Sequence, residues 1–186
     1  MKKASVFGYV TRLTLTLFII ASVVAAALAA INAITQPIIE QSVLEKTQQA
    51  IKTVLPGGYQ QEIMDFTDTT GLVSKVYEGE GGYAVEVIPT GFDGPITMMV
   101  GVDKNGTVLG ICVISHTESA GLGAVAASAT SAGVAFRNQF IGLGEVRVDK
   151  DGGQIDAITN ATITSRAICD GVNAAIACTA GLGGGL

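Results

Sequence analysis

LTLTLFIIASVVAAALAAINAIT, residues 13–35, is the stretch that decides what kind of protein this is. It carries no charged side chain, and about 20 mostly apolar residues is the length at which a helix crosses a lipid bilayer. Lys2, Lys3 and Arg12 precede it, and Glu40 is the first charged residue after it. Since positive charge stays preferentially on the cytoplasmic side, the pattern predicts a single-pass cell-membrane protein with a cytoplasmic N-terminus and an extracytoplasmic main domain.

A cleaved signal peptide is the competing interpretation, because VVAAALAA offers small-residue cleavage sites. The apolar core of a signal peptide usually has about 7–15 residues, which is shorter than this run. The length therefore favours an anchor that is retained. Under either interpretation the main domain lies outside the cytoplasm.

The composition agrees with a membrane protein and excludes a nucleic-acid-binding one. Of the 186 residues, 48% are apolar and 15% are charged, and the formal net charge is −5. Nucleic-acid binding calls for clustered Lys and Arg, which this balance does not provide. The chain has 24 Gly, no Trp and only 5% aromatic residues. A bound cofactor would therefore be held mainly by backbone and small side chains.

Three segments are predicted along the chain. Residues 1–36 form a cytoplasmic stub and the transmembrane anchor helix. An amphipathic connecting helix is predicted over residues 37–58, because Pro37 can open a helix, the apolar residues that follow keep a helical period and Pro56-Gly57-Gly58 ends it. Residues 59–186 form the extracytoplasmic domain.

The segments within this domain predict strands first and helices later. YAVEVIPTG, ITMMVGVD and TVLGICVIS have the β-branched residues of strands, and Lys104-Asn105-Gly106 supplies a hairpin turn. EVRVDKDGGQIDAIT predicts two further strands joined at Asp151-Gly152-Gly153. GLGAVAASATSAGVAFRNQF predicts a loop and then a helix, and ITSRAICDGVNAAIACTAG a final helix. The order indicates an α+β fold.

The residues that most often bind metals make no recognisable site. Cys112, Cys169 and Cys178 fit no zinc or iron–sulfur spacing. If Cys169 and Cys178 share a helix, about 13 Å separates them, too far for a disulfide. All three are expected to be buried, apolar thiols.

Acidic residues and the single histidine are also interpreted as structural. Asp149, Asp151 and Asp156 lack the further ligands of a calcium loop, and a charged turn explains them better. His116 would have to serve any Ser–His or Cys–His couple. A lone histidine at a strand end is more often a surface or hydrogen-bonded residue, so no catalytic residue is predicted.

HTESAGLGA, residues 116–124, leads from a strand through Gly121-Leu122-Gly123 into a helix. Glycines let a backbone approach a ligand closely, amides at a helix start favour anions, and Glu118 can accept hydrogen bonds from a heterocycle. The same pattern also suits a plain strand-to-helix turn. The spacing alone leaves both interpretations open.

DAITNATITS, residues 156–165, carries four hydroxyl side chains around Asn160. It suits an edge strand with a hydroxyl-bearing wet face, or a loop whose threonine is used chemically. A hydroxyl needs a base to act as a nucleophile, and none lies nearby in sequence. Another enzyme can modify a threonine on an exposed, recognisable segment, and a phosphate ester at Thr162 would tether a nucleotide permanently.

Asp156 to Thr162 resembles the flavinylation signal D-x-x-[ST]-G-A-T, whose last threonine receives FMN through its phosphate. HTESAGLG resembles the H-x-E-T-P-G-L-G segment of the same FMN-binding domain, and FRNQF resembles the segment that follows it. Asn160 stands for the usual Gly, and Ser119-Ala120 for Thr-Pro. With the anchor, the order of motifs resembles the G subunits of Rnf ion-translocating ferredoxin:NAD⁺ oxidoreductases, relatives of the C subunits of Na⁺-translocating NADH:quinone reductases.

The resemblance implies a set of site residues. Thr162 would carry FMN as a phosphothreonyl ester installed by a flavin transferase, which would recognise Asp156. Thr159, Asn160 and Ala161 would hold the attachment loop, while Thr164 and Ser165 would donate hydrogen bonds to the phosphate. The cofactor would also contact Glu118, Gly121, Leu122 and Gly123.

The resemblance also implies a function. The chain would relay electrons through covalent FMN as a subunit of an ion-translocating complex, without catalysing a reaction alone. Its partners would be the other subunits, the membrane and the transferase. Two alternatives stay open: a single-anchor FMN carrier of another extracytoplasmic electron chain, and a pilin-like structural subunit. Pilins usually have an acidic residue early in the apolar run, and this run has none.

Overall fold

The computed structural model describes residues 3–183, in two compact units that divide after Glu45. Helix α1 (Lys3–Val54) runs without a break through Pro37, so the helix predicted to open there is continuous with the segment before it. A proline inside a helix removes one backbone hydrogen bond and costs roughly 3 kcal/mol. The residues on both sides favour a helix strongly enough to outweigh that cost.

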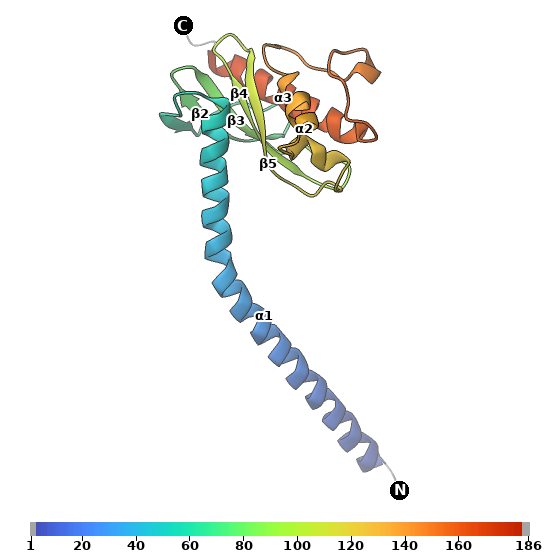
Figure 1. The fold of residues 1–186 in the computed structure, drawn as a ribbon. Helices are drawn as coiled ribbons and strands as arrows, with labels where there is room; N and C mark the ends of the chain where they lie inside the picture. The colour runs from blue at the N-terminus through green and yellow to red at the C-terminus, as the bar shows by residue number, and fades with distance from the viewer. Residues whose placement is uncertain (1–2, 184–186) are drawn as a thin grey trace. The chain divides into compact units, whose positions relative to one another are not determined.

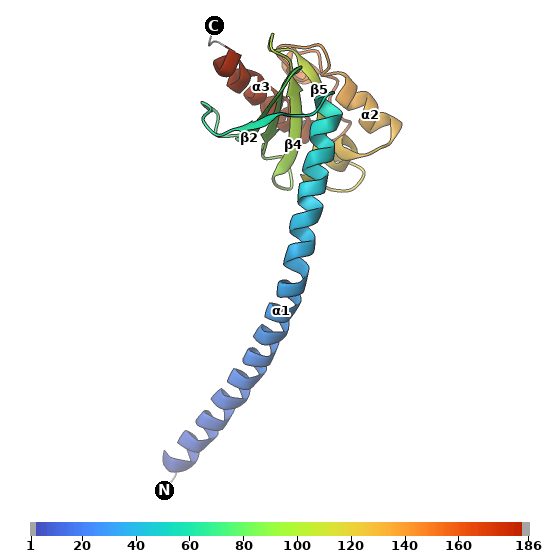
Figure 2. The same cartoon turned by 90° about the vertical axis from the view of Figure 1, so that its left-hand side faces the viewer.

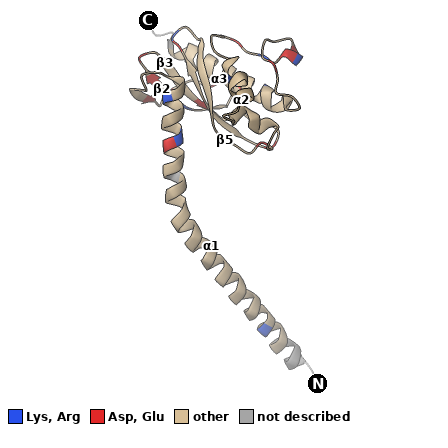
Figure 3. Cartoon of the chain, in the orientation of Figure 1, with Lys and Arg blue, Asp and Glu red and all other residues tan. Residues whose placement is uncertain are grey.

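The first unit is the apolar part of α1. Residues 13–39 contain no Asp, Glu, Lys or Arg, and Figure 3 shows a long tan stretch along α1. Within the described chain, α1 is the one helix long and apolar enough to cross a membrane, judged by length and composition. Its most apolar 18-residue stretch has a mean hydropathy of 2.5.

The second unit is built on one antiparallel sheet whose strands pair in chain order. The strands are β1 (Gln61–Ile63), β2 (Val73–Gly79), β3 (Gly82–Val87), β4 (Ile96–Val102) and β5 (Val108–His116). The three strands predicted from sequence are confirmed as β3, β4 and β5. The predicted turn is confirmed as well, and the Asp103 carboxylate accepts from the amides of Asn105 and Thr107 across it. β1 and β2 were not predicted.

Helices cover both faces of the sheet (Figures 1 and 2). On one face, α3 (Thr162–Gly183) packs Ile168, Val172 and Ala175 against inward-facing residues of β3 and β4. On the other, Ile51 and Val54 at the end of α1, with Leu55 just after it, pack against Tyr77, Ala84 and Met99. Odd and even strand positions thus serve two separate cores, as the two-residue period of a strand requires.

Short helices and loops join β5 to α3: η1 (Gly123–Ala127), α2 (Ser131–Asn138) and η2 (Asp149–Asp151). The loop followed by a helix predicted over residues 121–140 is confirmed. The prediction of two strands in residues 145–159 is wrong, since this segment is a loop with one isolated bridge between Val148 and Ile155. Val146, Val148 and Ile155 are buried like strand residues, but Gly152 takes a left-handed φ of 80° and turns the chain. The α+β architecture is confirmed.

Candidate functional site

The stretch 156–165 is a loop that leads into α3, and not an edge strand. Asn160 has a φ of 60°, the only positive φ of a non-glycine residue within residues 3–183. Asn tolerates this left-handed conformation better than most residues. The Ser165 side chain lies beneath the loop, fully buried, where Oγ accepts from the Ile158 amide and donates to the Ala161 carbonyl, both at 3.0 Å. The loop is therefore fixed in one conformation.

Thr162 is the first residue of α3, and its side chain is half-buried. The first amides of a helix have no partner within it and carry partial positive charge. No acidic side chain in the first turn opposes that charge. The Lys150 ammonium adds a full positive charge at this position, where its Nζ donates to the Thr162 Oγ1 at 2.8 Å. This corner is suited to an anionic group.

Glu118 lies buried opposite this helix start, with only 8% of its surface exposed. Its Oε2 accepts from the Thr164 hydroxyl at 2.5 Å, and its Oε1 from the Asp93 amide at 3.2 Å. Two glycines make room for the carboxyl group: a Cβ on Gly91 or on Gly123 would lie 2.2 Å from one of its oxygens. The carboxyl group is held by shape as well as by hydrogen bonds.

A cavity of about 400 Å³ separates the Glu118 loop from the start of α3. Pockets of roughly 300–1,000 Å³ are the usual size for small ligands and cofactors. This one is mainly apolar with a few polar groups. Its walls are formed by Phe92, Asp93, Glu118, Ser119, Leu122, Gly123, Lys150, Asn160, Ala161, Thr162, Ile163 and Thr164.

The structure brings most of the residues singled out from the sequence to this cavity. Those that line it are Glu118, Leu122, Gly123, Asn160, Ala161, Thr162 and Thr164. Gly121 and Thr159 instead line a second groove beside the loop of residues 156–161, together with Asp156. Ser165 lies beneath the loop and reaches neither.

The hydroxyl groups of Thr164 and Ser165 are used within the protein. Thr164 donates to Glu118, and Ser165 donates to the Ala161 carbonyl. An anion at the helix start would therefore meet the backbone amides and Lys150 before these hydroxyls. The two side chains position the loop and the carboxyl group instead.

Sequence reasoning did not assign Phe92, Asp93, Ser119, Lys150 and Ile163 to the site. Phe92 and Asp93 belong to the turn between β3 (Gly82–Val87) and β4 (Ile96–Val102). The Asp93 carboxyl accepts a short hydrogen bond from the Ser119 hydroxyl and so ties that turn to the Glu118 loop. Lys150 was assigned to a hairpin, and no sequence pattern relates it to a residue twelve positions later.

Asp156 presents its side chain to solvent while its backbone is clamped. Gln139 accepts from the Asp156 amide at 2.7 Å and donates to its carbonyl at 3.3 Å. The next amide, that of Ala157, donates to the Asp149 carboxylate at 3.1 Å. An exposed carboxylate on a fixed backbone is a suitable mark for another protein to recognise.

The cysteines and the histidine lie outside the cavity. Cys169 and Cys178 are free, buried thiols on α3, and Cys112 is half-buried on β5. Burial, with Asp170 and Asp151 nearby, raises the pKa of Cys169 to about 12, so this thiol stays protonated. The His116 Nδ1 is buried and has no hydrogen-bond partner within the described residues. None of these groups reaches a wall of the cavity.

Comparison with known proteins places the same region in a family. The model of the FMN-binding domain matches residues 91–177, a range that contains every residue lining the cavity. The chain is similar to the G subunit of the ion-translocating oxidoreductase complex of Methanosarcina acetivorans, at 31% identity over 90% of this chain and 93% of the relative.

Two further relatives have comparable coverage. The G subunit of the Na(+)-translocating ferredoxin:NAD(+) oxidoreductase complex of Acetobacterium woodii is 32% identical over 90% of each chain. The G subunit of the ion-translocating oxidoreductase complex of Cronobacter sakazakii is 34% identical over 86% of this chain and 85% of its own length. Similarity thus extends over nearly all of the chain and well beyond the cavity.

Proposed function

Because the chain belongs to the family of G subunits of ion-translocating oxidoreductase complexes, we propose that it carries FMN as a phosphoester of Thr162 and relays electrons within such a complex. The observation that supports the attachment most directly is the place of the Thr162 hydroxyl. It lies on the wall of the cavity, at the start of α3, beside the Lys150 ammonium.

The residues present fit an FMN group. Lys150 and the first amides of α3 offer positive charge for the phosphate. The exposed side chains of Phe92 and Leu122 offer apolar surface for a flavin ring. The Glu118 carboxyl group lies opposite, as an acceptor held between Gly91 and Gly123. A bound FMN supplies the uptake and release of one or two electrons.

The protein's own residues then have distinct tasks. Thr162 fixes one end of the cofactor, Asn160 turns the chain so that this hydroxyl faces the cavity wall, and Ser165 keeps the loop closed. Glu118 and Thr164 hold the opposite wall in register with α3. Asp156, exposed on its clamped backbone, is the recognition point for the transferase.

Intact-mass analysis tests the covalent attachment. Protein produced with an active flavin transferase should gain the mass of FMN minus water and show flavin fluorescence in a denaturing gel. Thr162→Ala should remove both signals. Thr69→Ala, a matched change at an exposed loop threonine, should keep them. A bare-chain mass for the wild type, with a transferase shown to be active on another substrate, would refute the attachment.

We also propose that α1 anchors the chain in the membrane with the domain of residues 59–186 outside the cytoplasm. The support is the uncharged run of residues 13–39 and the cations before it. A reporter enzyme that is active only outside the cytoplasm, fused to the C-terminus, should be active. Activity only of a cytoplasmic reporter at the same position would reverse the orientation.

The proteins that co-purify with this chain distinguish a subunit of the ion-translocating complex from a carrier of another electron-transfer chain. A tagged chain should co-purify with the other subunits of an ion-translocating oxidoreductase from its native membrane. Flavinylated protein that co-purifies with a different redox partner would instead support the single-anchor carrier. The FMN-binding match and the cavity leave nothing to favour a pilin-like role.

A further inference from the structure

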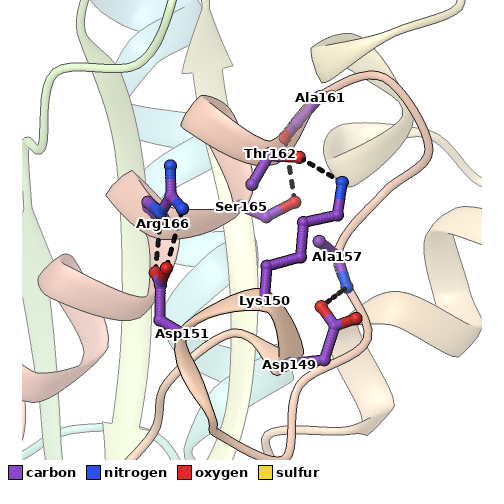
Figure 4. A network of polar contacts seen from close by, with 8 residues as sticks. All are labelled: Asp149, Lys150, Asp151, Ala157, Ala161, Thr162, Ser165 and Arg166. Atoms are coloured by element: carbon purple, nitrogen blue, oxygen red, sulfur yellow. Dashed lines mark hydrogen bonds and ion pairs between the residues drawn. The ribbon is translucent and has the colours of Figure 1, made fainter.

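Three consecutive residues of η2 contact three different parts of the candidate site (Figure 4). Asp149 accepts from the Ala157 amide at 3.1 Å, in the attachment loop. Lys150 donates to the Thr162 hydroxyl at 2.8 Å. Asp151 accepts from the Arg166 guanidinium through two hydrogen bonds of 2.6 and 2.7 Å, one turn further along α3. The η2 turn thus forms hydrogen bonds with the loop before α3, with the Thr162 hydroxyl and with α3 itself.

The backbone of this turn is itself fixed. The Gly153 amide donates to the Val148 carbonyl at 2.9 Å, and the Asp149 amide donates to the Ile155 carbonyl at 2.8 Å. Gly153 packs so closely that a Cβ there would lie 2.1 Å from the Arg147 carbonyl oxygen. The position of Lys150 is therefore set by a closed loop, although its side chain is exposed.

The two neighbouring aspartates leave the charge of Lys150 unpaired. Arg166 and Asp151 form the one ion pair found in the described part of the chain, and this pairing lowers the pKa of Asp151. Asp149 is directed to the Ala157 amide. Within the described residues, the ammonium of Lys150 therefore lies against the Thr162 hydroxyl and forms no ion pair with a carboxylate.

We propose that Lys150 is the residue of this chain that prepares Thr162 for flavinylation and then neutralises the phosphoester, an inference that rests on the proposed attachment. An ammonium group has only donors, so Thr162 Oγ1 accepts from Lys150 and its own proton points elsewhere, available to a base of the transferase. A positive charge beside the oxygen favours the negative charge that develops on it as the proton leaves. Asp149 and Asp151 are positioning residues, since they act by holding Lys150 in place.

The chemistry of the transfer shows where the charge is needed. A hydroxyl does not attack the phosphorus of a phosphate that lacks a good leaving group. The donor must therefore be a flavin nucleotide whose phosphate is joined to a second phosphate as an anhydride. The Oγ1–phosphorus bond forms, the anhydride bond breaks, and the second phosphate leaves with the rest of the donor. The hydroxyl proton passes to the transferase, and no electrons are exchanged. The product diester keeps one negative charge, next to Lys150.

Transfer rates measured by intact mass test this role. The full chain in detergent, purified without flavin, is mixed with transferase and flavin dinucleotide, and the modified fraction is followed over time. Lys150→Gln should slow the transfer roughly tenfold, because a charge-assisted donor at the reacting oxygen is lost. Lys150→Arg should stay within about threefold of the wild type, since it keeps the charge. Lys104→Gln, at the exposed β4–β5 turn, is the matched control and should leave the rate unchanged.

Salt separates a charge effect from a structural one. The rate ratio between wild type and Lys150→Gln should shrink as ionic strength rises, because exposed charges are screened. Before flavin is attached, Lys150→Gln and Lys150→Arg should melt at the same temperature as the wild type, since a single contact of an exposed charged side chain adds little stability. Equal rates for wild type and Lys150→Gln would overturn the role of Lys150 and leave the attachment intact. Equal slowing by Gln and Arg would overturn the charge role, whereas an unmodified wild type would refute the attachment itself.

Discussion

Asn160 determines the path of the chain into α3, because its φ of 60° directs the following residues toward the cavity wall. Glycine adopts this conformation freely, Asn with little strain and β-branched residues only with difficulty. The side chain itself is exposed. Position 160 is thus constrained by backbone geometry and not by chemistry.

Substitutions of Asn160 should separate the effect of backbone geometry from that of side-chain chemistry. Asn160→Gly should keep the free energy of unfolding within about 0.5 kcal/mol and retain flavinylation, since the loop geometry is preserved. Asn160→Val should lose about 1–2 kcal/mol, the cost of a left-handed residue with a branched Cβ. Urea unfolding of the domain measures both. Equal stability of the Gly and Val variants would contradict the strain argument.

Gly123 is constrained by space. A Cβ there would lie 2.2 Å from the Glu118 Oε2 and 2.6 Å from the Thr164 Oγ1. Gly123→Ala should therefore break the Glu118–Thr164 hydrogen bond and destabilise the domain by about 2 kcal/mol. Gly144→Ala is the matched control, because the nearest atom to its Cβ would be 3.7 Å away. Unfolding curves that coincide for the two variants would show that the carboxyl group can move aside freely.

At the scale of elements, the end of α1 packs directly on the backbone of the sheet. A Cβ on Gly101 of β4 would lie 2.2 Å from the Val54 carbonyl oxygen. Tyr77 of β2 lies in the same apolar cluster, edge-on to Tyr59 with ring centroids 5.1 Å apart. The last turns of α1 are therefore part of the core of the folded domain.

Alkaline titration should loosen this contact. Burial, with smaller contributions from Glu62 and Glu86, raises the pKa of Tyr77 from 10.0 to about 12. The folded state thus holds the phenolic proton longer than the unfolded chain, so stability is complete below pH 10 and falls as pH rises from 10 to about 12. Unfolding free energies measured across this range should fall less steeply for Tyr77→Phe than for the wild type. A slope for Tyr77→Phe identical to that of the wild type would contradict the prediction.

Periodicity predicted the elements that keep a strand or helix period over enough residues. These are β3, β4, β5, α2 and α3, together with the long apolar part of α1. β1 and β2 were missed because VSKVYEG carries charges on exposed positions and β1 has only three residues. Residues 145–159 misled because Val146, Val148 and Ile155 alternate like a strand, yet they reach the core from a loop closed at Gly153.

The site could be predicted only as far as its motifs extend. Glu118 and Thr162 lie in two recognisable segments, and the structure brings both to one cavity. Lys150, Phe92 and Asp93 come from connections whose residues follow no pattern of their own, since their role depends on how the loops fold over the sheet. That Thr164 and Ser165 would be used internally also needed coordinates.

For the whole molecule, the boundary of the folded domain lies inside α1. The last turns of this helix bury Ala50, Ile51 and Val54, and Leu55 is buried just after the helix ends, whereas the preceding apolar segment is exposed. Residues 46–186 should therefore form a folded, water-soluble protein that the transferase modifies. Residues 56–186 should lose on the order of 5 kcal/mol, since three large apolar side chains no longer cover the sheet, a large share of the stability of a typical domain.

Thermal melting of the two pieces, with circular dichroism as the signal, checks this boundary. The longer piece should melt cooperatively. The shorter piece should melt without a sharp transition or should aggregate. A shorter piece as stable as the longer one would place the end of α1 outside the folding unit.

The Glu118–Thr164 hydrogen bond joins residues 46 positions apart, so the two walls of the cavity come together only in the folded domain. A ligand that binds there stabilises the fold by mass action, to a degree that ordinarily depends on its free concentration. The proposed flavin ester at Thr162 would remove that dependence, because the tether would set a constant effective concentration of the ring at the cavity. Neither dilution nor scarcity of flavin would then empty the site, and the carrier would stay loaded for as long as the chain stays folded.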